Sequence, residues 1–300
     1  MYRKLKYINT NEEALDLNVH SDPFLYDLSG AGFEYENTLI QNNYTNVLDL
    51  TSVSKRNIPL SGSLIIDDYD NATIYKRVEK ITRILNYDQL LNMDGNKKQF
   101  GRLEYTNAYG LEVYTPAIVQ GFTFGEITTD PVKELQVSLS LTRGSNVWIA
   151  KAPKFTRFVV EAMGNAHYHP YSHPWQHGVL YKVGQGTIAP IGGTDYGRTI
   201  IRINGQISPF TLRIASTNGL YEKRIVYTGS LRQDDVEVID GINLFAHKNG
   251  QNDFANFDLE NGDSPFVSLM PNTDYKLNLH ADHMKGFMTV EIYETWVSVP

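Results

Sequence analysis

The sequence predicts a mainly β protein, with a single helix in an α+β first half and a β-sandwich as its second half. Short segments that alternate apolar and polar residues run through most of the chain, and Gly, Asn, Asp or Pro separates them. That rhythm is typical of sandwiches and barrels. One segment alone, within residues 70–92, has the period of an amphipathic helix instead.

In the predicted helix the apolar residues that recur at helical spacing are Ile74, Val78, Ile81, Ile84 and Leu85. Asp70 or Asn71 can cap its start. Four basic residues lie off the apolar stripe and are our candidate partner contacts in this half: Lys76, Arg77, Lys80 and Arg83. They form either a solvated surface or a docking surface for an acidic neighbour.

Strands are expected on both sides of the helix. Residues 1–66 contain short strands, and residues 55–69 suggest two strands joined by a Ser-Gly turn. Residues 103–115 predict a hairpin that turns at 107–110 and whose edge suits pairing with another subunit. Residues 132–144 alternate as a half-buried strand does, and the region of Pro153 suggests a boundary between domains 1–151 and 152–300.

The second half is rich in strand patterns throughout, and no helical period competes with them. The expected strands lie within residues 155–163, 178–184, 198–205, 210–216, 223–229, 235–240, 242–249, 265–270, 275–281 and 286–299. We therefore expect an independent β-sandwich here.

Composition narrows the function. With 27 basic and 34 acidic residues the net charge is −7, which argues against nucleic acid as the main partner. The chain has no cysteine, so disulfides, thiolate metal sites and cysteine nucleophiles are excluded. No apolar stretch is long enough for a membrane span and no signal peptide is visible, so we expect a soluble protein made in the cytoplasm.

A cluster of histidines in residues 167–178, HYHPYSHPWQHG, could have three roles. His167, His169, His173 and His177 could bind a metal ion, but no carboxylate accompanies them. The segment could instead contact a subunit or partner through its aromatic residues, or be a plain loop. The candidate contact residues are Tyr168, Tyr171 and Trp175.

Motifs of known chemistry are missing. The sequence has no P-loop and no GxSxG elbow, and the glycine-rich residues 184–193 lack the following helix that would hold a pyrophosphate. His280 and His283 fit a turn between strands as well as a metal motif. We therefore expect no enzyme activity, no cofactor and no metal site.

The order of these elements resembles the distal tail protein (Dit) family of siphophages. The matching stretches in the first half are KRNIPLSGSLII (55–66), YKRVEKITRILN (75–86) and GRLEYTNAYGLEVYTPAIVQGFTFGEI (101–127). In the second half they are RTIIRINGQISPFTLRI (198–214), NGDSPFVSLMPNTDYKLNL (261–279) and GFMTVEIYETW (286–296). The sequence has Ser208-Pro209 where the family has Asn-Pro, and Pro271-Asn272 where it often has Pro-Gly, which keeps the turn chemistry.

The resemblance implies a structural virion protein of the tail tip or baseplate, assembled in the host cytoplasm. The first domain would form a hexameric ring that continues the tail tube, and a galectin-like second domain would anchor receptor-binding proteins. The implied partners are other copies of the chain, a tail tube protein, a tail-tip (tail-associated) protein and a receptor-binding protein.

Two other functions remain open. The aromatic residues of the histidine-rich segment could stack on sugar rings, which would make the second half a carbohydrate-binding module for a host saccharide. A glycoside hydrolase is the second alternative, but no acid pair stands out for it.

Overall fold

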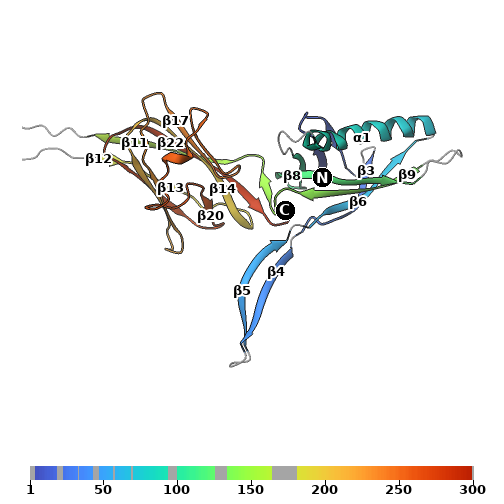
Figure 1. Cartoon of the computed structure of the whole chain (residues 1–300), viewed down its shortest axis with the longest axis horizontal. Coiled ribbons are helices and arrows are strands. Elements are labelled where there is room, and N and C mark those ends of the chain that lie inside the picture. Colours follow the sequence, from blue (N-terminus) through green and yellow to red (C-terminus); the bar gives the residue numbers. More distant parts are fainter. Residues whose placement is uncertain are drawn as a thin grey trace, which may run out of the picture. The chain divides into compact units, whose positions relative to one another are not determined.

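A computed structural model describes residues 4–18, 23–32, 34–42, 47–56, 58–68, 70–93, 100–125, 134–163 and 181–298, in two compact units (Figure 1). The first unit comprises Met1–Lys151 with Trp296–Pro300, and the second comprises Ala152–Thr295. Residues 296–300, which the sequence assigned to the second domain, thus group with the first unit. Within the described residues α1 is the one α-helix among many strands, so the predicted mainly β fold with a single helix is confirmed.

The first unit is built on a continuous antiparallel sheet. Its strands run in the order β2 (Ala14–Asp16), β1 (Lys4–Ile8), β7 (Gly101–Thr106), β8 (Glu112–Phe124), β9 (Glu134–Arg143), β6 (Leu60–Asp67) and β3 (Phe24–Ser29). A short strand, β10 (Trp148–Ala150), also pairs with β8. On β9 the alternate residues Leu135, Val137, Leu139 and Leu141 are buried, which confirms the predicted half-buried strand.

Helix α1 (Asn71–Met93) packs on this sheet through the predicted apolar stripe. Its buried apolar residues are Ile74, Val78, Ile81, Ile84 and Leu85. They join one hydrophobic core with side chains of the sheet, among them Leu5, Leu64 and Leu103. Burial of this stripe fixes which face of α1 is left for other contacts.

The expected Ser-Gly turn within residues 55–69 was wrong. Strand β6 runs straight through Gly62, which pairs with Leu139 of β9, while β3 pairs along the other edge. A Cβ at position 62 would lie 2.9 Å from both Leu25 Cδ1 and the Tyr26 carbonyl oxygen. Gly62 therefore serves the close approach of β3 and not a change of direction.

Strands β4 (Glu34–Asn42) and β5 (Val47–Arg56) form a two-stranded sheet of their own (Figure 1). Their antiparallel register runs from Glu34 opposite Arg56 to Asn42 opposite Val47. The loop before β4 is tied to the first unit by Arg143, whose Nη2 donates to the Gly32 carbonyl at 3.1 Å. Asn146 ties β5 in the same way, because its Nδ2 donates to the Lys55 carbonyl at 3.2 Å.

The second unit contains two antiparallel sheets. The larger has the order β19 (Gln251–Asn252), β18 (Phe245–Lys248), β17 (Val236–Asp240), β14 (Asp195–Ile207), β22 (Met284–Trp296), β11 (Lys154–Met163) and β12 (Tyr181–Val183), with β20 (Ser268–Leu269) also on β14. The smaller has the order β13 (Gln185–Ile188), β21 (Tyr275–Ala281), β15 (Phe210–Ser216) and β16 (Glu222–Tyr227).

One hydrophobic core joins the two sheets of the second unit. Ile203 and Val290 contribute to it from the larger sheet, and Leu212 and Leu277 contribute from the smaller. Polar residues alternate with these buried ones along β15 and β21, as expected for sheets with one solvated face. The predicted β-rich second half is therefore confirmed, and its likeness to galectins stays a prediction.

Candidate assembly surface

The start of α1 is fixed by Asp70, one of the two caps that the sequence offered. Its Oδ1 accepts a hydrogen bond from the Ala72 N–H at 3.2 Å. Its Oδ2 accepts from the Thr73 hydroxyl at 2.9 Å and from the Thr73 N–H at 3.2 Å. These bonds, with that of the Thr73 hydroxyl first, lower the pKa of Asp70. They also satisfy amides that have no acceptor inside the helix.

The second half of α1 is held by a buried carboxylate. Asp88 is fully buried, and its Oδ2 accepts a hydrogen bond from the Tyr7 hydroxyl of β1 at 2.8 Å. Its Oδ1 accepts from the hydroxyl and the N–H of Thr10, at 2.6 and 3.0 Å. Burial, followed by the contact with Asp88, raises the pKa of Tyr7. Asp70 and Asp88 thus anchor the first turn and the second half of α1, which fixes the positions of the basic residues between them.

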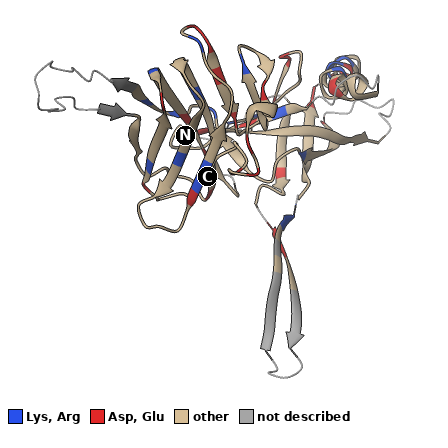
Figure 2. Ribbon diagram, turned by 60° about the vertical axis from the view of Figure 1, so that its left-hand side comes forward, with Lys and Arg blue, Asp and Glu red and all other residues tan. Residues whose placement is uncertain are grey.

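Those four basic residues do not form one free surface. Arg77 donates to the Asp67 carbonyl at 2.9 Å, and its Nη2 lies 3.0 Å from Asp68 Oδ2. Arg83 Nη2 lies 3.3 Å from Glu13 Oε1. Lys76 and Lys80 are exposed, and Figure 2 shows acidic as well as basic residues along the helix. The structure therefore pairs Arg77 and Arg83 with acidic residues of their own unit, and Arg83 is exposed like the two lysines.

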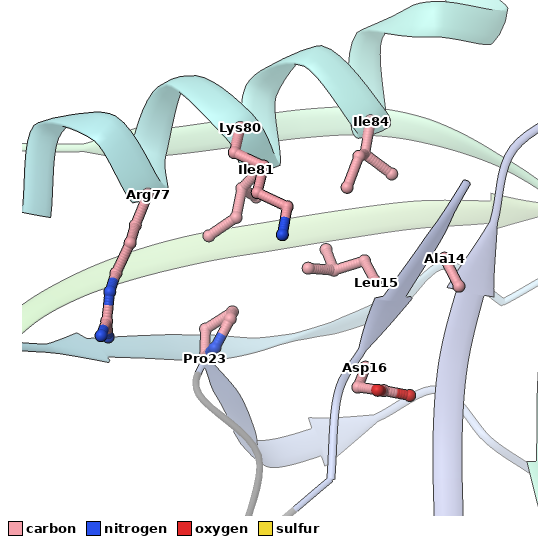
Figure 3. Close-up of a pocket in the computed structure, with 8 residues that line it drawn as sticks. All are labelled: Ala14, Leu15, Asp16, Pro23, Arg77, Lys80, Ile81 and Ile84. Carbon is pink, nitrogen blue, oxygen red and sulfur yellow. The ribbon is translucent and has the colours of Figure 1, made fainter. Parts of the chain in front are cut away.

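A hollow of about 300 Å³ lies beside this helix, between α1, β2 and the start of β3. Its lining residues are Ala14, Leu15, Asp16, Pro23, Arg77, Lys80, Ile81 and Ile84. Figure 3 shows Arg77 and Lys80 extending from α1 towards Pro23 and Leu15. The hollow thus has apolar walls, basic side chains on the helix side and the carboxylate of Asp16 on the β2 side, which suits a partner segment with apolar and hydrogen-bonding groups.

The hollow also lies at an edge of the sheet. Among the described strands β2 pairs with β1 alone, so its other edge is not covered by a strand. Edge strands are the usual places where one chain adds a strand to another. Together, the hollow and the edge of β2 form what we name the α1–β2 surface.

The β4–β5 hairpin is the second candidate surface for contact with a partner. An isolated two-stranded hairpin is marginally stable in water. The described side chains of β4 are exposed from Glu34 to Thr38, including Tyr35 at 42%. Within the hairpin, Arg56 Nη1 lies 3.6 Å from Glu34 Oε1, and both side chains are more than half exposed. A two-stranded hairpin needs further strands or a packing surface for independent stability, so this one offers a place for a partner.

The prediction that the hairpin of residues 103–115 has a free edge for pairing with another subunit was wrong. Residues 103–115 do form the expected β7–β8 hairpin, with its turn at Asn107–Gly110. However, β1 covers the outer edge of β7, and β9 and β10 cover that of β8. This hairpin lies inside the sheet, so it cannot accept a strand from another subunit.

The other candidate residues are less informative. Tyr168, Tyr171 and Trp175, with the four histidines around them, lie outside the described residues. His280 is the last residue but one of β21 and His283 directly precedes β22, which confirms the turn between strands. In the described part of the chain no three His, Asp or Glu side chains gather into a metal-binding group. No described helix is both long and apolar enough to cross a bilayer.

Comparison with known proteins gives matches in structure alone. No protein-family model matches the sequence, and neither does any curated protein. The crystal structure of the Dit protein of phage SPP1, described as a paradigm of the hub adsorption apparatus in phages that infect Gram-positive bacteria, matches with a TM-score of 0.64. The two sequences are 11% identical, and the match covers 98% of this chain and 99% of that one.

A chain of the phage P2 baseplate, in its activated conformation with Ca, matches with a TM-score of 0.57 at 14% identity. The same baseplate with Sr gives a TM-score of 0.56. Both matches cover the whole of both chains. The fold of this protein is therefore that of the SPP1 Dit protein over nearly its entire length.

Proposed function

We propose that the protein is a structural adaptor of a phage tail, which forms a ring between the tail tube and the tail tip or baseplate. The observation that carries this proposal is the extent of the structural match. The matches with the SPP1 Dit protein and with the P2 baseplate chain both include the two units of this protein. They also include at least 99% of each of those chains.

The first unit is the proposed ring-forming part. A ring built from head-to-tail contacts needs two different complementary surfaces on each copy. The α1–β2 surface, which Lys80 lines and beside which Lys76 is exposed on α1, is one candidate. The β4–β5 hairpin, with exposed Glu34 and Glu36, is another. Glu34 already faces Arg56 within the hairpin, so Glu36 is the carboxylate that we assign to Lys76 and Lys80 of the neighbouring copy, because opposite charges favour contact. Six copies closing in this way would continue the tail tube.

The second unit would face the partners. In this proposal the second unit anchors receptor-binding proteins, and the ring of first units contacts the tail tube and tail-tip proteins. The protein acts as part of the assembled phage tail. The protein then works by position and symmetry, with no bond chemistry. Residues 167–178 are a proposed contact for a receptor-binding protein.

Native mass spectrometry and negative-stain microscopy of the full chain test the ring. We expect a closed oligomer, either alone or after addition of the tail tube and tail-tip proteins. A double variant, Lys76→Glu with Lys80→Glu, should weaken the oligomer by at least about tenfold because it reverses the charge of the α1–β2 surface. The matched control, Lys276→Glu with Lys285→Glu, changes two exposed lysines of the second unit and should leave the ring intact.

The outcomes separate two failures. A wild-type chain that stays monomeric with every tail partner contradicts the adaptor function itself. A ring that forms equally well in the α1–β2 double variant contradicts only the assignment of that surface.

A further inference from the structure

The smaller sheet of the second unit has a pocket of about 370 Å³ near the start of β15. The buried core residues Phe210 and Leu212 alternate on this strand with Thr211, which therefore points to the outer face of the sheet. The strand register places His280 of β21 on one side of Thr211 and Val226 of β16 on the other, and all three line the pocket. Small-molecule sites have volumes of about 300 to 1,000 Å³. We name this site the β15 pocket.

Hydrogen bonds to the surrounding loops fix the walls of the β15 pocket. Beside the lining residue Pro209, the Ser208 N–H donates to the His283 carbonyl at 2.9 Å, and the His283 N–H donates to Ser208 Oγ at 3.1 Å. On the β16 side, the N–H and the hydroxyl of Thr228 both donate to the Asn256 carbonyl, at 2.8 and 3.0 Å. Walls that are already ordered favour binding, because no ordering cost is added when a ligand enters.

Three polar side chains of the β15 pocket are available to a ligand. In the described structure no residue hydrogen-bonds the Thr211 hydroxyl, the His280 imidazole or the Asp282 carboxylate. The hydroxyl and the imidazole can each donate and accept, and the carboxylate accepts. Pro209 and Val226 add apolar surface beside these groups. A sugar ring matches this combination, because its hydroxyl groups donate and accept while its C–H groups are apolar.

Two arginines lie next to the pocket on the same face of the sheet. Arg213 follows Thr211 by two residues, which is about 7 Å along β15, and the register places Arg224 of β16 directly opposite Arg213. Glu222 pairs with Arg213, because its Oε1 and Oε2 accept from Nε and Nη2 at 2.7 and 2.8 Å. Arg224 meets Asp263 through its own backbone N–H at 2.7 Å, and no described residue accepts a hydrogen bond from its guanidinium group.

The arginine pair favours an anion at this place. Like charges directly opposite each other destabilise a sheet, and Glu222 offsets only the charge of Arg213. On the other side of Arg213 the register places Asn278 of β21, whose amide can donate as well, and Lys276 is exposed further along β21. A carboxylate or a phosphate would therefore find charge-assisted donors one step from the β15 pocket.

We propose that the second unit binds an acidic saccharide on the outer face of its smaller sheet. One sugar ring occupies the β15 pocket, and the carboxylate or phosphate of the saccharide pairs with Arg213 and Arg224. An acidic peptide is a poorer occupant, because the Asp282 carboxylate at the pocket repels its charge and the peptide lacks a ring of hydroxyl groups. The site is separate from the aromatic residues of 167–178, and it does not depend on whether the first unit forms a ring.

Saturation-transfer NMR with the full chain measures the binding of small saccharides. The probes are trigalacturonic acid, which carries carboxylates, glucose 1-phosphate, which carries a phosphate, and the neutral maltotriose. We expect at least one acidic probe to bind about tenfold or more tightly than maltotriose, because charge-assisted hydrogen bonds are the stronger ones. The acidic probe that binds identifies whether the natural acidic group is a carboxylate or a phosphate.

Three variants of exposed side chains test the position of the site. Arg224→Gln should weaken binding of the acidic probe by about tenfold or more, because it removes the unpaired guanidinium group. Asp282→Ala should weaken it by about fivefold or more through lost hydrogen bonds to the ring, although removal of a negative charge by itself would strengthen the binding of an anion. The control Arg157→Gln, on β11 of the larger sheet, should bind as wild type.

Two further probes decide between a saccharide and a simple anion site. Pentaglutamate and inorganic phosphate should bind more weakly than the acidic saccharide, and equal binding of either would overturn the proposal, since charge alone would then be recognised. The proposal also fails if neither acidic saccharide binds, or if Arg224→Gln leaves their binding unchanged. None of these results would contradict the adaptor function, which depends on assembly of the ring.

Discussion

Replacing Asp88 with alanine tests whether the buried carboxylate holds α1 on the sheet. The change removes an acceptor that serves Tyr7 through one hydrogen bond and Thr10 through two. It also leaves the Tyr7 hydroxyl without that acceptor, in a side chain that is fully buried. Hydrogen bonds to charged groups contribute about 1.5 to 3 kcal/mol each, and a buried group left without its partner costs about 1 to 3 kcal/mol.

The hydrogen-bond energies and the cost of the unpaired hydroxyl describe partly the same loss, so adding them overestimates the destabilisation. We expect Asp88→Ala to lower the free energy of unfolding of the first unit by about 3 to 5 kcal/mol, the range for breaking a buried polar network. Tyr7→Phe removes one of the three bonds and leaves the Thr10 bonds in place. Its expected cost is about 1 to 2 kcal/mol.

Urea unfolding followed by tryptophan fluorescence measures both changes. Two of the three tryptophans report on the first unit, because Trp148 is fully buried in it and Trp296 packs against the same core. Glu79→Ala is the matched control on α1, because this side chain is exposed, and it should stay within about 0.5 kcal/mol of wild type. A cost below about 1 kcal/mol for Asp88→Ala would refute the reasoning, since α1 would then be held by its apolar stripe alone.

Three more predictions concern the two cores and the pH dependence of the first unit. Ile81→Ala should cost about 2 to 5 kcal/mol in the same urea assay, because it opens a cavity under α1. Gly186→Ala should destabilise the second unit by about 1 to 3 kcal/mol in calorimetry, because the added Cβ overlaps the ring of Phe158. Although burial pushes the pKa of Glu104 upward, its hydrogen bonds to Arg102 and Lys151 outweigh this and lower it. The stability that Glu104 contributes is therefore present above its ordinary pKa and lost as pH falls below it, and acid unfolding of Glu104→Gln followed by circular dichroism should lack this component.

Local patterns predicted the elements well. The helical period placed the buried stripe of α1 correctly, and the short polar residue before it proved to be the cap. Strict alternation identified β9, because one face of that strand is buried and the other is not. Gly62 misled because a glycine that allows two strands to approach looks, in sequence alone, the same as a glycine in a turn.

Long-range partners could not be predicted in this way. Arg83 donates a hydrogen bond to Glu13, which lies 70 positions away in the sequence. No local sequence pattern can therefore predict that this arginine is paired. The same holds for the sheet order, which puts β1 against β7 and thereby covers the hairpin that seemed free. The basic character of α1 was visible in the sequence, but the hollow beside it depends on β2 and Pro23, which reach it only in the folded chain.

The sheet order of the first unit also has a consequence for its synthesis. Strands β2 and β3 are consecutive in the chain, yet they lie at opposite ends of the sheet order. The strands between them extend as far as β9, which ends at Arg143. The β2 and β3 residues around the hollow therefore cannot reach their final places until nearly half of the chain has left the ribosome. Contacts between residues far apart in the sequence slow folding. We therefore expect the first unit to fold slowly and to be completed in one late step instead of strand by strand.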